Sequence, residues 1–217
     1  MSHPGKIISI WKLFLLFYLF FFVTACDKIS HGKVEVKDRQ EVSIGRLICG
    51  GHLPLAVVEK KYQDDLTTFR LKTVQNHDWN EVMKDLKTGR LSGTFILSPL
   101  AMKMIRDGFP VKIVLKADRN GNGFVLSKKI KTIAALKDMK IIIAVPHIYS
   151  QHNVLLHKIL KQHNISLDKV TIIGMSPRDM INSLRRGEID GFMVGEPEGN
   201  KSVELGVGWM ALVAAEL

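Results

Sequence analysis

The chain has 217 residues, 46% of them hydrophobic, and a formal net charge of +10. This length and apolar content allow one large core or two small ones. The P-loop, the dinucleotide-binding glycine pattern, the nucleophile elbow and the H-E-x-x-H zinc motif are all absent from the sequence. We therefore expect a protein that is not an enzyme, with no catalytic residues, no bound metal and no cofactor.

The N-terminus has the features of an export signal. Two lysines are followed by an uninterrupted apolar run of eleven residues, Leu13 to Val23, and then by Thr24-Ala25-Cys26. Eleven apolar residues are too few to span a bilayer, but they suit the hydrophobic region of a signal peptide. The sequence VTAC resembles a bacterial lipobox. Residues 1–26 are therefore interpreted as a lipoprotein signal peptide with Cys26 as the lipidated residue.

An uncleaved anchor from Ile7 to Ala25 is the alternative. It would hold Lys12 within the membrane span, which costs about 2.5–3.5 kcal/mol on insertion scales. In either case the rest of the chain lies outside the cytoplasm and is tethered to a membrane. Asp27 directly after Cys26 resembles the inner-membrane retention signal of Gram-negative lipoproteins. This places the protein on the periplasmic side of the inner (cytoplasmic) membrane.

The charge of the chain limits its classes of binding partner, and its cysteine content limits its disulfides. Without Lys6 and Lys12 the chain keeps 29 Lys and Arg against 21 Asp and Glu. Nucleic acid is not expected as a partner of an exported lipoprotein, so the excess indicates either a basic surface near anionic headgroups or capture of a small anion. Lipidation of Cys26 would leave Cys49 as the one remaining thiol, so we expect no internal disulfide and place Cys49 in a buried strand.

Strands and helices alternate along the mature chain, after a polar tether over residues 27–42. In the first half we expect strands at 46–49, 68–74, 94–97 and 111–116 and helices at 54–62, 79–87 and 100–106. In the second half we expect strands at 124–127, 140–145, 170–175, 191–197 and 208–215 and helices at 130–138, 151–162 and 177–186. This order is typical of a largely parallel α/β sheet wound with helices.

A repeated helix–turn–strand unit divides the chain. LKTGRLSGTFILSP, residues 86–99, matches LRRGEIDGFMVGEP, residues 184–197, in its Leu, Gly and Pro positions. Two copies of one unit indicate two lobes that bend about two crossings, near 118–127 and 196–209. We place the domains as lobe I at 43–120, lobe II at 121–200 and a return segment to lobe I at 201–217.

Candidate site residues follow the ends of strands, which form the ligand edge of open α/β sheets. His52, Trp79 and Ser98 follow such ends in the first lobe, and Glu196 corresponds to Ser98 in the repeat. Structural roles are the alternative for three of them. Trp79 would be a hydrophobic staple, Ser98 a helix cap and Glu196 part of the hinge.

A helix start in the second lobe provides further candidates. Ser150 is expected to cap the helix after the strand that stops near His147, and to leave the N–H groups of Gln151 and His152 free for an anion. Capping alone is sufficient to explain Ser150. His147, His152 and His157 are five residues apart, a spacing that does not place them on one helix face and argues against zinc.

Four segments between about Leu47 and Trp209 follow one another in a distinctive order: GGHLPLAVVEKK, FILSPLAM, VPHIYSQHNVLLHKILKQHNI and SLRRGEIDGFMVGEP. Together they resemble the nitrate/sulfonate/bicarbonate/taurine type of ABC-importer substrate-binding protein, a relative of the thiamine-pyrimidine-precursor binders. It implies an α/β two-lobe periplasmic-binding-protein clamshell of type II. Such a protein closes on a small solute and delivers it to a membrane permease, whose partner ATPase supplies the energy.

The resemblance also implies ligand residues. Trp79, Asn122 and His152 occupy the places of a Trp, a Gln and a His in the nitrate- and bicarbonate-binding branch, and the change from Gln to Asn argues against nitrate itself. Family members usually continue past the strand matching GWMALVAAEL, so the C-terminal part of the first lobe is expected to be missing. A truncated or sensory relative without transport activity is one alternative. A pyrimidine-precursor enzyme on the same fold is another, although Cys49 alone does not supply its Cys-rich site.

Overall fold

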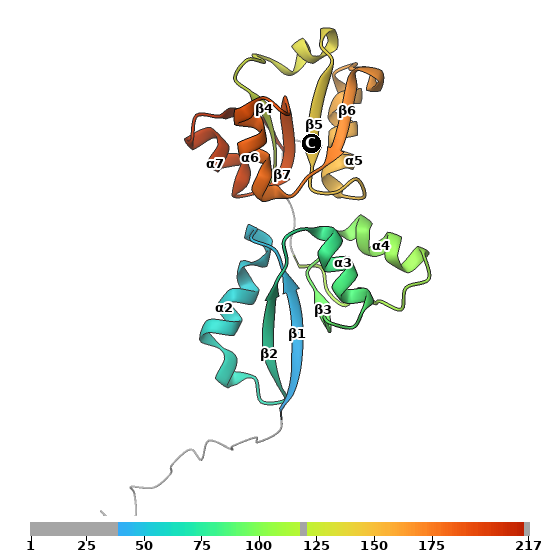
Figure 1. Ribbon diagram of the computed structural model, residues 1–217, viewed down its shortest axis with the longest axis vertical. Coiled ribbons are helices and arrows are strands. Elements are labelled where there is room, and N and C mark those ends of the chain that lie inside the picture. The colour runs from blue at the N-terminus through green and yellow to red at the C-terminus, as the bar shows by residue number, and fades with distance from the viewer. Residues whose placement is uncertain (1–38, 118–120, 215–217) are drawn as a thin grey trace, which may run out of the picture. The chain divides into compact units, whose positions relative to one another are not determined.

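Two sheets organise the part of the chain that the computed structural model describes, residues 39–117 and 121–214 (Figure 1). The first has three parallel strands in the order β2-β1-β3, namely β1 (Gln40–Arg46), β2 (Phe69–Gln75) and β3 (Gly93–Thr94). Three helices accompany them: α2 (Leu53–Lys61), α3 (Trp79–Lys87) and α4 (Ser98–Arg106). Short 3-10 turns lie at η1 (Gly50–His52) and η2 (Gln63–Asp65).

The second sheet is mixed, with five strands in the order β6-β5-β7-β4-β8. The strands are β4 (Asn122–Ser127), β5 (Ile141–Val145), β6 (Val170–Gly174), β7 (Gly191–Gly195) and β8 (Gly208–Val213). β5 runs parallel to β6 and β7, whereas β4 is antiparallel to β7 and β8. The helical elements are η3 (Ile133–Asp138), α5 (Gln151–Gln162), η4 (Leu167–Lys169), α6 (Pro177–Arg186) and α7 (Glu198–Glu204).

Alternating residues of the second sheet build a core on each of its faces. Phe124 and Leu126 of β4 belong to one hydrophobic cluster, while Val125 between them belongs to the other. The strands approach closely at Gly191, where an added methyl group would lie 2.6 Å from the Val125 carbonyl oxygen. The smaller core of the first sheet contains Leu47, Trp79, Val82, Leu97 and Leu100.

Helices with clear capping chemistry occur where the sequence predicts them. The predictions for α3, α5 and α6 are confirmed to the residue. Asp78 and Ser150 cap the first two through their side chains, and Gly187, in the left-handed conformation (φ 73°), ends the third. Helix caps of this kind can be predicted from the sequence because they depend only on residues that are neighbours in the chain.

Three predicted strands need correction. The first strand begins at Gln40, so the tether predicted over 27–42 runs three residues too far, and Cys49 lies beyond this strand at the N-cap of η1. Residues 111–116 form no strand and are largely exposed. Gly208–Val213 pairs with β4 in the second sheet, so this part of 201–217 does not return to the first sheet as predicted.

The segment predicted to end the last repeat also differs from expectation. β7 stops at Gly195, and Pro197 stands at the N-cap of α7 after a cis peptide bond with Glu196. Cys26 and the export signal lie outside the described residues. Within residues 39–117 and 121–214, no helix is long and apolar enough to cross a membrane.

Candidate ligand-binding site

The start of α5 holds the most deeply buried polar candidates. Ser150 is fully buried, and its hydroxyl accepts a hydrogen bond of 3.2 Å from the Asn153 N–H, as the sequence predicts for a cap. The next residue, Gln151, has a buried side-chain oxygen with no hydrogen-bond partner among the described residues. The cap therefore orients a helix start whose side chains remain available.

His152 is only 4% exposed, yet neither of its ring nitrogens has a hydrogen-bond partner within the described chain. Burial lowers the pKa of His152 to about 4, so the ring is neutral at pH 7. A methyl group placed on Gly195 would lie 3.8 Å from both His152 Nε2 and Asn122 Oδ1. The structure thus brings two predicted site residues, from α5 and β4, to the same end of β7.

Trp79 is the first residue of α3 and is also 4% exposed. It belongs to the core of the first sheet, but its Nε1–H has no acceptor in the part of the chain that the structure describes. The rings of His52 and Trp79 meet edge to face, with centroids 5.8 Å apart and an interplanar angle of 80°. The predicted staple role is wrong, because a staple residue precedes the N-cap and Trp79 follows it. The ring packs in the core while its N–H stays unused.

His52 has a structural task of its own. Its Nδ1 accepts a hydrogen bond of 2.7 Å from the Leu47 N–H, which fixes the proton on Nε2. Burial, helped by the charge of Arg46, lowers the pKa of His52 to about 4. His52 also packs edge-on against Phe95, at 5.6 Å. It supports the Trp79 ring with one nitrogen already engaged.

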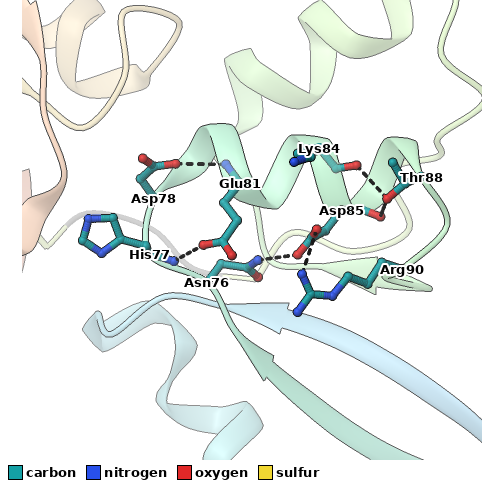
Figure 2. A network of polar contacts seen from close by, with 8 residues as sticks. All are labelled: Asn76, His77, Asp78, Glu81, Lys84, Asp85, Thr88 and Arg90. Atoms are coloured by element: carbon teal, nitrogen blue, oxygen red, sulfur yellow. Dashed lines mark hydrogen bonds and ion pairs between the residues drawn. The ribbon is translucent and has the colours of Figure 1, made fainter.

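A polar network that sequence reasoning missed holds the start of α3 (Figure 2). Asp78 Oδ1 accepts from the Glu81 N–H, and the Glu81 carboxylate accepts from the His77 N–H, one residue before the bond of a capping box. Deeper in, Asp85 accepts from the amide of Asn76 at 2.7 Å and from Arg90 at 3.3 Å. The only sequence feature pointing to this network was the pair of residues Asp78 and Glu81, three apart.

Glu196 makes hydrogen bonds to three other residues of the chain, through its backbone and its carboxylate. Its backbone carbonyl accepts a 3.0 Å hydrogen bond from the Gly50 N–H, and its own N–H donates to the Gly121 carbonyl at 2.8 Å. Its carboxylate accepts from the Asn200 N–H at 2.9 Å and so caps α7. These contacts favour the hinge interpretation of Glu196.

The remaining two candidates are less enclosed. His147 is half-buried, its Nδ1 accepts from the Tyr149 N–H at 3.0 Å, and burial lowers its pKa. Ser98 is exposed and is the first residue of α4. The N-cap position falls on Leu97, without a side-chain capping bond, so the capping role predicted for Ser98 is wrong.

A ring contact joins His52 with Trp79, and Asn122 and His152 both lie beside Gly195. The hydrogen bond from Gly50 to Glu196 connects the segments beside these pairs, because Gly50 belongs to η1 with His52 and Glu196 follows Gly195. Residues 39–117 and 121–214 contain no group of three His, Cys, Asp or Glu side chains placed to hold a metal ion.

The model of the NMT1-like family matches residues 35–217. The chain belongs to the NMT1-like family. Among proteins similar to this family member is the nitrate import ATP-binding protein NrtC of Synechocystis sp., 28% identical over 176 residues, which cover 72% of the chain and 26% of the relative. The chain thus spans about a quarter of that relative's length.

Two solved structures share the fold of this NMT1-like protein. The ligand-binding component of an ABC-type import system from Staphylococcus aureus, solved with zinc bound, has a TM-score of 0.74 and 28% identity over 82% of this chain and 62% of its own. The periplasmic nitrate-binding protein NrtA from Synechocystis has a TM-score of 0.74 and 21% identity, over 83% and 53%. The predicted fold class and the resemblance to binding components of ABC importers are confirmed.

Proposed function

We propose that this chain is an extracytoplasmic solute-binding protein of an ABC importer, which captures a small anion or polar organic solute and delivers it to a permease and its ATPase. The observation that carries the proposal is the set of buried polar atoms at Trp79, Gln151 and His152 that lack partners among the described residues. A buried polar group without a hydrogen bond costs about 1–3 kcal/mol, so such groups are rare unless something binds them. A bound solute would supply the missing partners.

The roles of the residues follow from their contacts. Trp79, Asn122, Gln151 and His152 contact the solute in this proposal. Ser150 and His52 hold the helix start and the tryptophan ring in place. In the proposal Glu196 serves as the hinge, and Ser98 and His147 remain candidate contacts of the solute. No residue of the set is assigned a catalytic role, which agrees with a family whose structural neighbours bind solutes.

We also infer that Cys26 carries a lipid anchor on the periplasmic side of the inner membrane. The support is the VTAC sequence and the aspartate that follows it. Mass spectrometry of the membrane-extracted protein tests this inference. A mature chain that begins at an unmodified residue other than Cys26 would contradict it.

Ligand-induced thermal stabilisation tests the proposed function. The full chain is titrated with nitrate, bicarbonate, alkanesulfonates and pyrimidines while its tryptophan fluorescence is followed during heating, and a ligand at 100 times its Kd should stabilise the folded state by about 2.7 kcal/mol. Trp79→Ala and His152→Ala should abolish the shift. His157→Ala is the matched control, because His157 lies exposed on the same helix, α5.

The outcomes separate the alternatives. A folded protein that none of these solutes stabilises would overturn the solute-binding proposal and favour a sensory relative that binds no solute. A shift that survives both alanine substitutions would mean that the solute binds elsewhere.

A further inference from the structure

Ser176 stands at the start of a helix but does not cap it. It occupies the N-cap position of α6, directly before Pro177, and is only 9% exposed. A serine in this position usually accepts a hydrogen bond from an N–H of the first turn, yet its side chain makes no such bond here. The first turn closes on the Ser176 backbone instead, whose carbonyl accepts from the Asp179 N–H at 3.0 Å. The hydroxyl is therefore not used by α6 itself.

The hydroxyl of Ser176 bonds to a residue far away in the sequence. It donates a hydrogen bond of 3.2 Å to the backbone carbonyl of His77, 99 residues earlier. His77 lies between β2 and the Asp78 cap of α3, and its own N–H donates to the Glu81 carboxylate at 2.6 Å (Figure 2). The backbone of His77 is thus held by α3 on one side and by Ser176 on the other. This joins a helix of the second sheet to the start of a helix of the first.

Two weaker contacts join neighbouring parts of the same helices. The Nε2 atom of His77 lies 4.0 Å from a carboxylate oxygen of Asp179, and both side chains are more than half exposed. A pair with that exposure stabilises little. The Nζ atom of Lys103 in α4 lies 4.9 Å from the ring centroid of Tyr149, just before α5, and this ring is 43% exposed. Because Ser176 is the least exposed of these side chains, its hydrogen bond is the contact best shielded from water.

We propose that Ser176 is a positioning residue whose hydroxyl fixes the start of α3 against the start of α6. Without the hydroxyl the His77 carbonyl loses its partner, so the first turn of α3 opens more often while α6 keeps its own hydrogen bonds. A consequence for solute capture rests on the proposed function, in which Trp79 at the start of α3 contacts the solute. A loosened helix start would hold this ring in a less defined position and weaken binding.

Hydrogen–deuterium exchange of the full chain, followed by mass spectrometry without added solute, tests the inference. In Ser176→Ala the amides of residues 77–82 should exchange about fivefold faster, because a typical hydrogen bond is lost there, while those of 177–180 keep their rates. Ser176→Thr retains a hydroxyl and should exchange like the unsubstituted chain, whereas its isostere Ser176→Val should repeat the effect of alanine. Ser166→Ala is the matched control, since the exposed Ser166 hydroxyl donates only to nearby Asp168, at 3.4 Å.

Unchanged exchange of residues 77–82 in Ser176→Ala and Ser176→Val would overturn the inference. Faster exchange confined to 177–180 would overturn it as well, because that result would mean a local role in α6. A separate titration with nitrate and bicarbonate should give an apparent Kd about fivefold higher in Ser176→Ala for whichever anion binds, and an unaltered Kd in Ser166→Ala. If neither these anions nor the wider panel above binds to the unsubstituted chain, the proposed function fails, while the exchange result still decides the role of Ser176.

Discussion

Two buried histidines of this chain differ in the contacts that they make. His52 and His152 are both almost inaccessible, and both have a pKa lowered to about 4. His52 satisfies a backbone N–H at Leu47 and packs against two aromatic rings. Neither nitrogen of His152 makes a hydrogen bond within the described residues. Burial alone therefore does not distinguish a structural histidine from a candidate ligand residue, whereas the hydrogen bonds of their nitrogens do.

The lowered pKa values predict a loss of stability in mild acid. In the unfolded chain these histidines titrate near 6.5, so between pH 6.5 and about 4 the unfolded state binds more protons than the folded state. The stability that they contribute is present above pH 6.5 and is lost as the pH falls toward 4, by about 3 kcal/mol for each ring. Urea unfolding at pH 7.5 and pH 4.5 measures the effect.

Variants separate this effect from the titration of carboxylates. His152→Gln and His52→Asn should each reduce the difference in unfolding free energy between the two pH values, because the substituted amides do not titrate. The exposed His157 provides the control variant, His157→Gln, which should keep the wild-type difference. An equal pH dependence in all four proteins would show that these rings are not the source.

At the scale of elements, the contact between β2 and α3 depends on buried polar groups. Asn76 follows β2 and is 1% exposed, and Asp85 near the end of α3 is 3% exposed. Their hydrogen bond of 2.7 Å ties the helix to the end of the strand, and Arg90 supplies the opposite charge at 3.3 Å. The orientation of Trp79 at the start of α3 is fixed by this tie together with the Asp78 cap.

Asp85→Ala should therefore destabilise the protein by about 1–3 kcal/mol, because it leaves the buried amide of Asn76 without its partner. The midpoint of urea unfolding measures the loss. Lys84→Ala, at the neighbouring exposed position of α3, should change the free energy of unfolding by less than about 0.5 kcal/mol. Equal midpoints for the two variants would contradict a supporting role of Asp85.

Elements whose ends are set by local chemistry were predictable, and those set by distant partners were not. Ser150 was identified as a cap from its position alone, and the structure places its hydroxyl on the Asn153 N–H. The pair of Asn76 and Asp85 was missed because nothing in the sequence tells which buried amide will meet which carboxylate. The strand at 208–213 was recognised, but its partner was not, since the pattern of one strand does not name the sheet that it joins.

At the scale of the whole molecule, the stretch after α4 stands out by its exposure. Residues 111–116 are rich in apolar side chains but have no strand pairing in the described chain. Ile113, Val114 and Leu115 are 54%, 90% and 74% exposed. An exposed apolar segment without strand pairing can act as a template for pairing with another chain.

Val114→Lys should therefore lower self-association of the protein. Sedimentation velocity across a concentration series should show a smaller share of dimers and larger species than in the unsubstituted chain, because the added charge opposes strand pairing. Val154→Lys is the comparison, since Val154 is 62% exposed on the helix α5, where no edge is available. Association that is unchanged in Val114→Lys, or reduced equally in both variants, would assign it to another surface.

The pairing of β8 with β4 also has a consequence for biosynthesis. β4 begins at Asn122, but its second neighbour is complete only at Val213. While the chain leaves the ribosome or an export channel, β4 has therefore been made long before the strand that covers its other edge. The second sheet reaches its final form late in synthesis, and a chaperone that binds unpaired strands would find its target there in that interval.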